Sequence, residues 1–65
     1  MIQENERYTI RNSFGYYLER GTPPTDIWVK EKEKALDLSF DRAFDLVITL
    51  NFVYKEKILF IIESK

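Results

Sequence analysis

The apolar stretch from Ser39 to Tyr54, followed almost at once by Ile58 to Ile62, limits what this chain can fold into. Apolar residues recur every three or four positions in the first stretch, as in an amphipathic helix. The second is apolar at every position, which is typical of a strand covered on both faces, with a buried helical segment as the alternative. A chain of 65 residues cannot readily bury all of this surface. Both the fold and the function predictions start from that surplus.

The first stretch predicts a helix over 39–54. Ser39 suits the N-cap, where its hydroxyl accepts from a free backbone N–H, and Asp41 favours the positive end of the helix dipole. Asn51 offers an earlier end, in a left-handed conformation. At about 100° per residue, one face is apolar and the other polar. The apolar face carries Phe40, Ala43, Phe44, Val47, Leu50 and Tyr54, and the polar face Asp41, Arg42, Asp45 and Thr49. We expect a sheet to pack on Phe40, Phe44, Val47 and Leu50.

The N-terminal third predicts a hairpin. We interpret 1–6 as a frayed leader and 7–20 as two strands, because polar and apolar residues alternate on both sides of a turn signal. Gly15 suits the positive φ that a short hairpin loop requires. Tyr16 and Tyr17 point in opposite directions on the return strand, so one ring is expected to face outward.

The remaining segments complete the predicted fold. Residues 21–26 form a loop, because Pro23 and Pro24 cannot donate to a sheet. Residues 27–38 are extended or form a short strand with a charged turn, and Trp28 is expected in the core with a partner for its indole N–H. The final strand spans 57–63. The prediction is a single α+β domain over 1–65, with a single-layer sheet of three to four strands in the order β-β-(β)-α-β packed on one amphipathic helix.

The layout resembles that of small uncharacterised accessory proteins of phages and prophages in Gram-positive bacteria. The resemblance rests on Tyr8 to Asn12, Gly15 to Leu18, Trp28 and Ala35, and on the helix that opens with Ser39 and Ala43. It implies the same order of hairpin, tryptophan segment, capped helix and final strand. It also implies a class of proteins that act by binding, in some cases to inactivate a host or defence protein. It implies no catalytic residue.

Composition argues against most classes of catalysis. The chain has no histidine or cysteine, so imidazole and thiolate metal sites and Ser-His or Cys-His nucleophiles are absent. With only two glycines it has no glycine-rich phosphate loop. Asp41 and Asp45 stand one helical turn apart, but on a polar helix face we interpret them as solubilising charges. We therefore expect no enzyme activity, no cofactor and no metal.

The localisation prediction depends on the N-terminal segment and on the length of the apolar run 58–62. Met1 to Arg7 is polar and has no apolar segment behind it, so no signal peptide is visible. The run 58–62 is too short to span a membrane. We expect a cytoplasmic protein, in the host cytoplasm if it is phage-encoded, with no membrane partner.

The apolar surplus predicts a protein interface. Alternate residues of the last strand must face away from the helix, and the end of the helix carries apolar residues that its buried face does not need. An exposed apolar cluster on a small chain usually marks an interface. The partner is expected to be another protein, a second copy of the chain, or both. The candidate interface residues are Tyr17, Phe52, Val53, Tyr54, Phe60 and Ile62.

Nucleic-acid binding is the alternative from another class. A base could stack on Tyr17 while basic side chains meet phosphates. The candidate residues are Arg7, Arg11, Tyr17, Arg20, Lys30 and Lys32. Against this stands the net charge of −1, from ten basic and eleven acidic residues, which offers little gain from counterion release. An ordinary cross-strand pair of Tyr17 with Arg11 also explains the pattern. We do not expect nucleic acid to be the partner.

Overall fold

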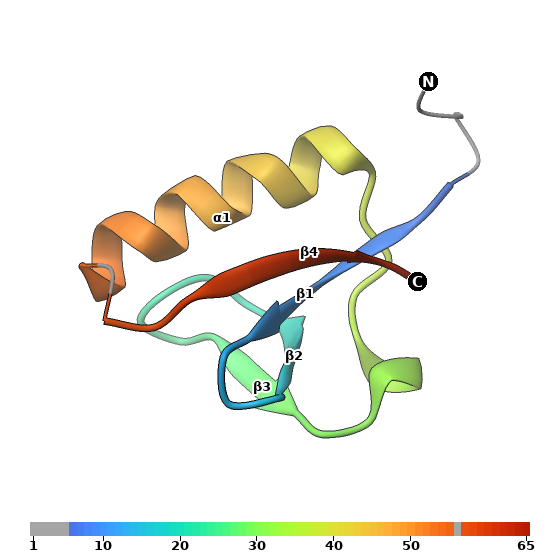
Figure 1. The fold of residues 1–65 in the computed structure, drawn as a ribbon, viewed down its shortest axis with the longest axis horizontal. Helices are drawn as coiled ribbons and strands as arrows, with labels where there is room; N and C mark the ends of the chain where they lie inside the picture. The colour runs from blue at the N-terminus through green and yellow to red at the C-terminus, as the bar shows by residue number, and fades with distance from the viewer. Residues whose placement is uncertain (1–5, 56) are drawn as a thin grey trace.

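One helix packs on a four-stranded antiparallel sheet with the strand order β3-β2-β1-β4. This computed structural model describes residues 6–55 and 57–65. The predicted α+β class and order of elements are confirmed. Figure 1 shows α1 lying along one face of the sheet, above β1 and β4. The strands are β1 (Tyr8–Asn12), β2 (Tyr17–Arg20), β3 (Ile27–Val29) and β4 (Phe60–Ser64), with the 3₁₀ turn η1 (Lys32–Lys34) and the helix α1 (Phe40–Tyr54) between β3 and β4.

The hairpin of β1 and β2 is held by one buried side chain. The Asn12 Oδ1 atom accepts hydrogen bonds from the backbone N–H groups of Phe14 and Tyr16, both at 3.0 Å. This satisfies two backbone donors inside the turn, which is why an asparagine suits the end of β1. Gly15 has a φ of 89°, as its place in the turn predicts. Of the predicted leader, residues 1–5 lie outside the described residues, and the Glu6 carboxylate accepts a hydrogen bond from the Tyr8 hydroxyl.

The segment between β3 and α1 forms backbone hydrogen bonds with both hairpin strands, β1 and β2. Leu36 N donates to Leu18 O on β2, and Leu38 forms an isolated antiparallel bridge with Tyr8 on β1. Within the charged run 30–34, Lys32–Lys34 form η1, which contains no buried residue. The segment 27–38 thus contains the short strand β3 followed by a charged 3₁₀ turn.

The helix α1 spans Phe40–Tyr54, within the predicted range 39–54. Ser39 is the N-cap, and its hydroxyl accepts a hydrogen bond from Arg42 N at 3.3 Å. The helix continues past Asn51 to Tyr54, and the C-cap residue Lys55 adopts the left-handed conformation. Lys57 N then donates to Tyr54 O. Because the chain needs these residues to reverse direction, β4 begins at Phe60, three residues later than predicted.

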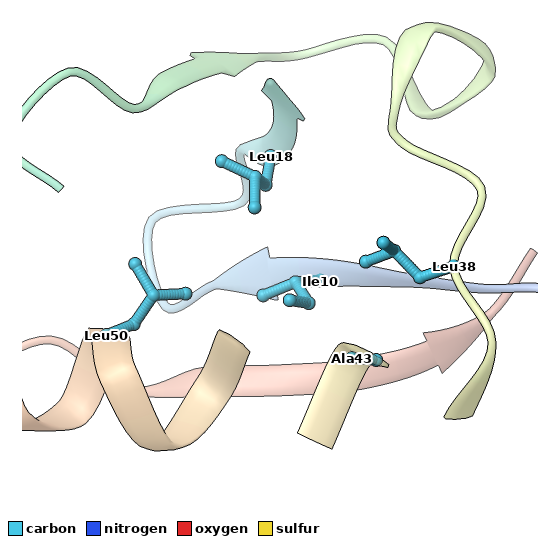
Figure 2. Packing of buried hydrophobic residues seen from close by; sticks show 5 residues of the cluster. All are labelled: Ile10, Leu18, Leu38, Ala43 and Leu50. Carbon is cyan, nitrogen blue, oxygen red and sulfur yellow. The ribbon is translucent and has the colours of Figure 1, made fainter. Parts of the chain in front are cut away.

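The core lies between α1 and the sheet. Its fully covered residues come from β1, β2, the segment before α1 and α1 itself: Ile10, Leu18, Leu38, Ala43 and Leu50. Figure 2 shows Ile10 on β1 in the middle of this group, with Leu18 and Leu38 on one side of it and Ala43 and Leu50 of the helix on the other. One packing prediction is wrong: Phe44 is 52% exposed, whereas Ala43 is fully buried. Ala43 faces the sheet, and the ring of Phe44, one residue later on the helix, lies to one side of the contact.

Candidate protein interface

Exposed apolar side chains are concentrated on α1 and at the start of β4. Along the helix, Phe44, Ile48 and Phe52 follow one another at four-residue intervals and are 52%, 54% and 82% exposed. Four residues make slightly more than one helical turn, so these side chains form one stripe on the surface. The stripe begins beside Phe40, whose ring stacks on Phe44 with centroids 6.4 Å apart.

The stripe is exposed because other residues of the helix already fill the contact with the sheet. Ala43 and Leu50 are completely buried, and Val47 and Tyr54 pack beside them. A helix of this width can bury only one side on a single-layer sheet. Among the described residues, no strand covers Phe44, Ile48 or Phe52.

A second group of exposed apolar residues lies where α1 ends and β4 begins. We call it the α1–β4 end; its residues are Phe14, Phe52, Val53 and Leu59, all more than two-fifths exposed. Ser13 N donates to Leu59 O, which brings the turn between β1 and β2 next to the start of β4. Figure 1 shows the last turn of α1 and the start of β4 at the same end of the molecule. This end therefore presents two phenylalanine rings and two aliphatic side chains to solvent.

Beneath this end, a polar contact ties α1 to the loop before β3. The Asp26 Oδ2 atom accepts hydrogen bonds from the Trp28 indole and the Tyr54 hydroxyl, both at 2.6 Å. Partial burial alone would raise the pKa of Asp26, but the two hydrogen bonds outweigh it and lower the pKa below its usual value. The same contact and partial burial raise the pKa of Tyr54. The indole N–H thus has the partner that its position requires.

The structure divides the six residues predicted for the interface. Phe52 and Val53 are exposed. Tyr54, Phe60 and Ile62 pack against the core, and the Phe60 ring lies 5.6 Å from Trp28 and 5.7 Å from Tyr54. Tyr17 is half-buried and pairs with Arg11 and Val29. The assignment of Tyr54, Phe60 and Ile62 to a free surface is therefore corrected.

The correction follows from the parity of β4. Phe60 and Ile62 pair with Asn12 and Ile10 of β1, whose side chains face α1. Side chains alternate between the faces of a strand, so Leu59 and Ile61 face away from the helix. They are 66% and 42% exposed. Sequence alone could not decide this parity, because every residue from 58 to 62 is apolar.

The basic residues of the nucleic-acid alternative are partly paired. The Arg11 Nε atom lies 2.8 Å from Glu63, and the Lys32 amino group lies 3.3 Å from the same carboxylate. Arg7 donates to the Asp37 carbonyl, and Lys30 lies over the Tyr16 ring at 5.9 Å. Arg20 is exposed at the end of β2. Tyr17 and Arg11 are cross-strand partners, so these residues do not form an open basic surface.

One depression in the described part of the chain has a volume of about 340 Å³ and is lined by Lys32, Glu33 and Lys65. Among residues 6–55 and 57–65, no three acidic side chains come together as a metal site would require. Asp41 and Asp45 are exposed on the outer side of α1.

No protein-family model, curated protein or solved structure matches this chain. Within the described residues, α1 lacks the length and continuous apolar character of a membrane-crossing helix.

Proposed function

We propose that this chain is a non-enzymatic protein-binding module that uses the α1–β4 end as its contact surface. The observation that supports this most directly is the 82% exposure of Phe52 beside the exposed Val53. An aromatic ring is costly to leave in water, and interfaces concentrate their binding energy in such side chains. Phe14 and Leu59 are further exposed apolar side chains at the same end of the molecule, and exposed apolar groups of this kind mark interaction sites.

In its more specific form, the proposal is an accessory protein of the phage type that binds and modulates or inhibits a host or defence protein in the host cytoplasm. The support is the resemblance in the order of elements, together with a surface suited to binding. The pairing of Arg11 and Lys32 with Glu63 is the reason why we prefer a protein partner to nucleic acid.

The test is to capture partners from the lysate of a Gram-positive bacterium with the tagged chain, and to repeat the binding with each purified candidate. We expect Phe52→Glu to weaken a true partner's affinity at least about tenfold, because the buried contact would then hold a charge. The control is Thr49→Glu, which adds the same charge at an exposed position on the same helix.

Two results would contradict the proposal. One is equal partner binding by the Phe52→Glu variant and the wild-type chain, with both shown to be folded by circular dichroism. The other is an affinity for DNA or RNA that falls steeply with salt and on Arg11→Ala, which would favour the nucleic-acid alternative.

A further inference from the structure

The outer edge of β4 is unpaired in the part of the chain that the structure describes, since β4 pairs only with β1. Ser13 N donates to Leu59 O, and Lys65 N donates to Arg7 O. Backbone groups alternate in direction along an antiparallel strand, so the odd-numbered residues from 59 to 65 bond toward β1. The N–H and C=O groups of Phe60, Ile62 and Ser64 therefore point to the free edge. Such an edge is a template for another strand.

The helix carries an apolar flank on the same side as this edge. On one flank of α1, Leu46 is half-buried because β2 and β3 extend the sheet beneath it. On the other flank, Phe44 and Ile48 are 52% and 54% exposed, since no described strand lies beyond β4. Each follows a core-facing residue by one position, which places both on the β4 side of a right-handed helix running parallel to β1. We call Phe44 and Ile48 the edge pair.

The edge pair and the middle of β4 lie at the same level. Phe40 contacts Tyr8, which pairs with Ser64 at one end of β4. Tyr54 contacts Phe60 at the other end. The middle of α1, between the edge-pair residues, therefore lies level with Ile62, the central residue of β4.

We propose that a second copy of this chain docks here, with the two β4 strands pairing antiparallel about a twofold axis at Ile62. The backbone groups of Ile62 then bond to those of Ile62 in the second copy, and those of Phe60 bond to those of Ser64. The two sheets become one continuous sheet, and the two helices lie side by side on the same face. An interface of this kind is self-complementary, as twofold symmetry requires.

The spacing of the elements fits this arrangement. Neighbouring strands lie about 4.8 Å apart, and α1 lies above β1 and β4, so the two helix axes would be about two strand spacings, or about 10 Å, apart. Helices in contact pack at about 8–10 Å. Phe44 of one copy then meets Ile48 of the other, which covers the edge pair without moving any element.

Charge and strand length select this register over its neighbours. With the axis at Ile62, Glu63 lies opposite Ile61 of the second copy. Moving the axis to Glu63 sets the two Glu63 carboxylates opposite each other, and moving it to Ile61 leaves Glu63 and Ser64 opposite residues 59 and 58, which precede β4. Like charges directly opposite destabilise strand pairing. The register at Ile62 also pairs β4 along its whole length.

The first measurement is the solution mass of the full chain by light scattering and sedimentation over a concentration series. We expect a reversible dimer, and we expect Ile48→Lys to weaken dimerisation at least about tenfold because the edge pair is buried only between copies. Phe44→Lys is a second variant. Both side chains are already exposed in the single copy, so neither change should unfold it. The control is Thr49→Lys on the solvent side of α1.

Hydrogen exchange of single amides tests the edge itself. In the dimer, the amides of Ile62 and Ser64 should be protected as strongly as those of Ile61 and Glu63. In the Ile48→Lys monomer, Ile62 and Ser64 should lose this protection while Ile61 and Glu63 keep it. A wild-type chain that stays monomeric, or a dimer whose Ile62 and Ser64 amides exchange freely, would overturn the proposal.

The outcome is independent of the proposed function, which rests on Phe52 and its neighbours. A loss of partner binding in Phe52→Glu says nothing about the dimer, which is tested by the solution mass of the wild-type chain. Conversely, a monomeric wild-type chain leaves the α1–β4 end free to bind a foreign protein.

Discussion

At the residue scale, Asp26 joins three parts of the chain. Its carboxylate accepts from Trp28 on β3 and from Tyr54 in the last turn of α1. Both donors carry large aromatic surfaces that pack on Phe60, so the polar contact also fixes the position of the rings. A charged acceptor strengthens both hydrogen bonds.

We expect Asp26→Asn to lower the free energy of unfolding at pH 7 by about 1–2 kcal/mol, because a neutral amide accepts more weakly and the site is partly screened by water. The measurement is urea denaturation followed by tryptophan fluorescence. Asp45→Asn makes the same change at an exposed helix position and serves as the control. Equal loss in the two variants would show that the Asp26 contact contributes nothing of its own.

The lowered pKa of Asp26 also predicts a pH dependence. The folded chain binds the proton less readily than the unfolded chain, so ionised Asp26 favours the folded state. Its contribution is complete above the ordinary aspartate pKa of about 4 and is lost as the pH falls through the lower folded value. The difference in unfolding free energy between wild type and Asp26→Asn should therefore shrink below about pH 4. A constant difference down to pH 2 would contradict this.

Truncating Phe60 and truncating Phe52 should have very different effects on stability. Phe60→Ala removes a ring packed on Trp28 and Tyr54 and should cost about 2–3 kcal/mol, somewhat less than a fully buried ring. Phe52→Ala removes a ring that is 82% exposed and should change the stability by no more than about 0.5 kcal/mol. Chemical denaturation of both variants at low concentration compares them directly. If both variants lost the same unfolding free energy, either Phe60 would not be packed in the core or Phe52 would not be exposed.

At the element scale, α1 ends on a residue that is not suited to its conformation. Lys55 has φ 54° and ψ 41°, a left-handed conformation that costs a side-chain-bearing residue about 1–2 kcal/mol. Glycine is the usual residue at such a helix end. The chain keeps this conformation because it must turn back within a few residues to place Phe60 against α1.

Lys55→Gly should therefore raise the free energy of unfolding by about 0.5–1 kcal/mol, since the relief of strain exceeds the entropy that glycine loses on folding. Thermal unfolding followed by circular dichroism provides the measurement. Lys57→Gly, which removes the same charge two residues later, should stabilise nothing. If both variants lower the stability, the strain at Lys55 is not significant.

The elements themselves could largely be predicted, because their signals are local. Ser39 accepts from the first turn of α1, Gly15 has the positive φ of the turn, and the charges of 30–34 remain in solvent. The candidate site could be predicted only in part. Phe44 was expected in the core because its angle on the helix is near the apolar side, but the position of the helix on the sheet decides which residue makes the contact.

At the scale of the whole molecule, a single-layer sheet leaves one side of α1 and one edge of β4 without cover in the described residues. A chain of this size buries only about 60% of the surface of its unfolded state, so its stability is small. A second copy would cover the edge pair and the edge of β4 at once. The gain would be shared between association and folding.

The apparent melting temperature should therefore rise with protein concentration. Unfolding of a dimer releases two chains, so mass action stabilises the folded state as the concentration increases. We expect a steady rise for the wild-type chain over a roughly hundredfold range of concentration, measured by circular dichroism in cells of different path length. The rise should be smaller in Ile48→Lys, whose dimer is weaker, and Thr49→Lys should follow the wild type. A wild-type melting temperature that does not change with concentration would show that the chain is stable without a second copy and that the edge pair remains exposed.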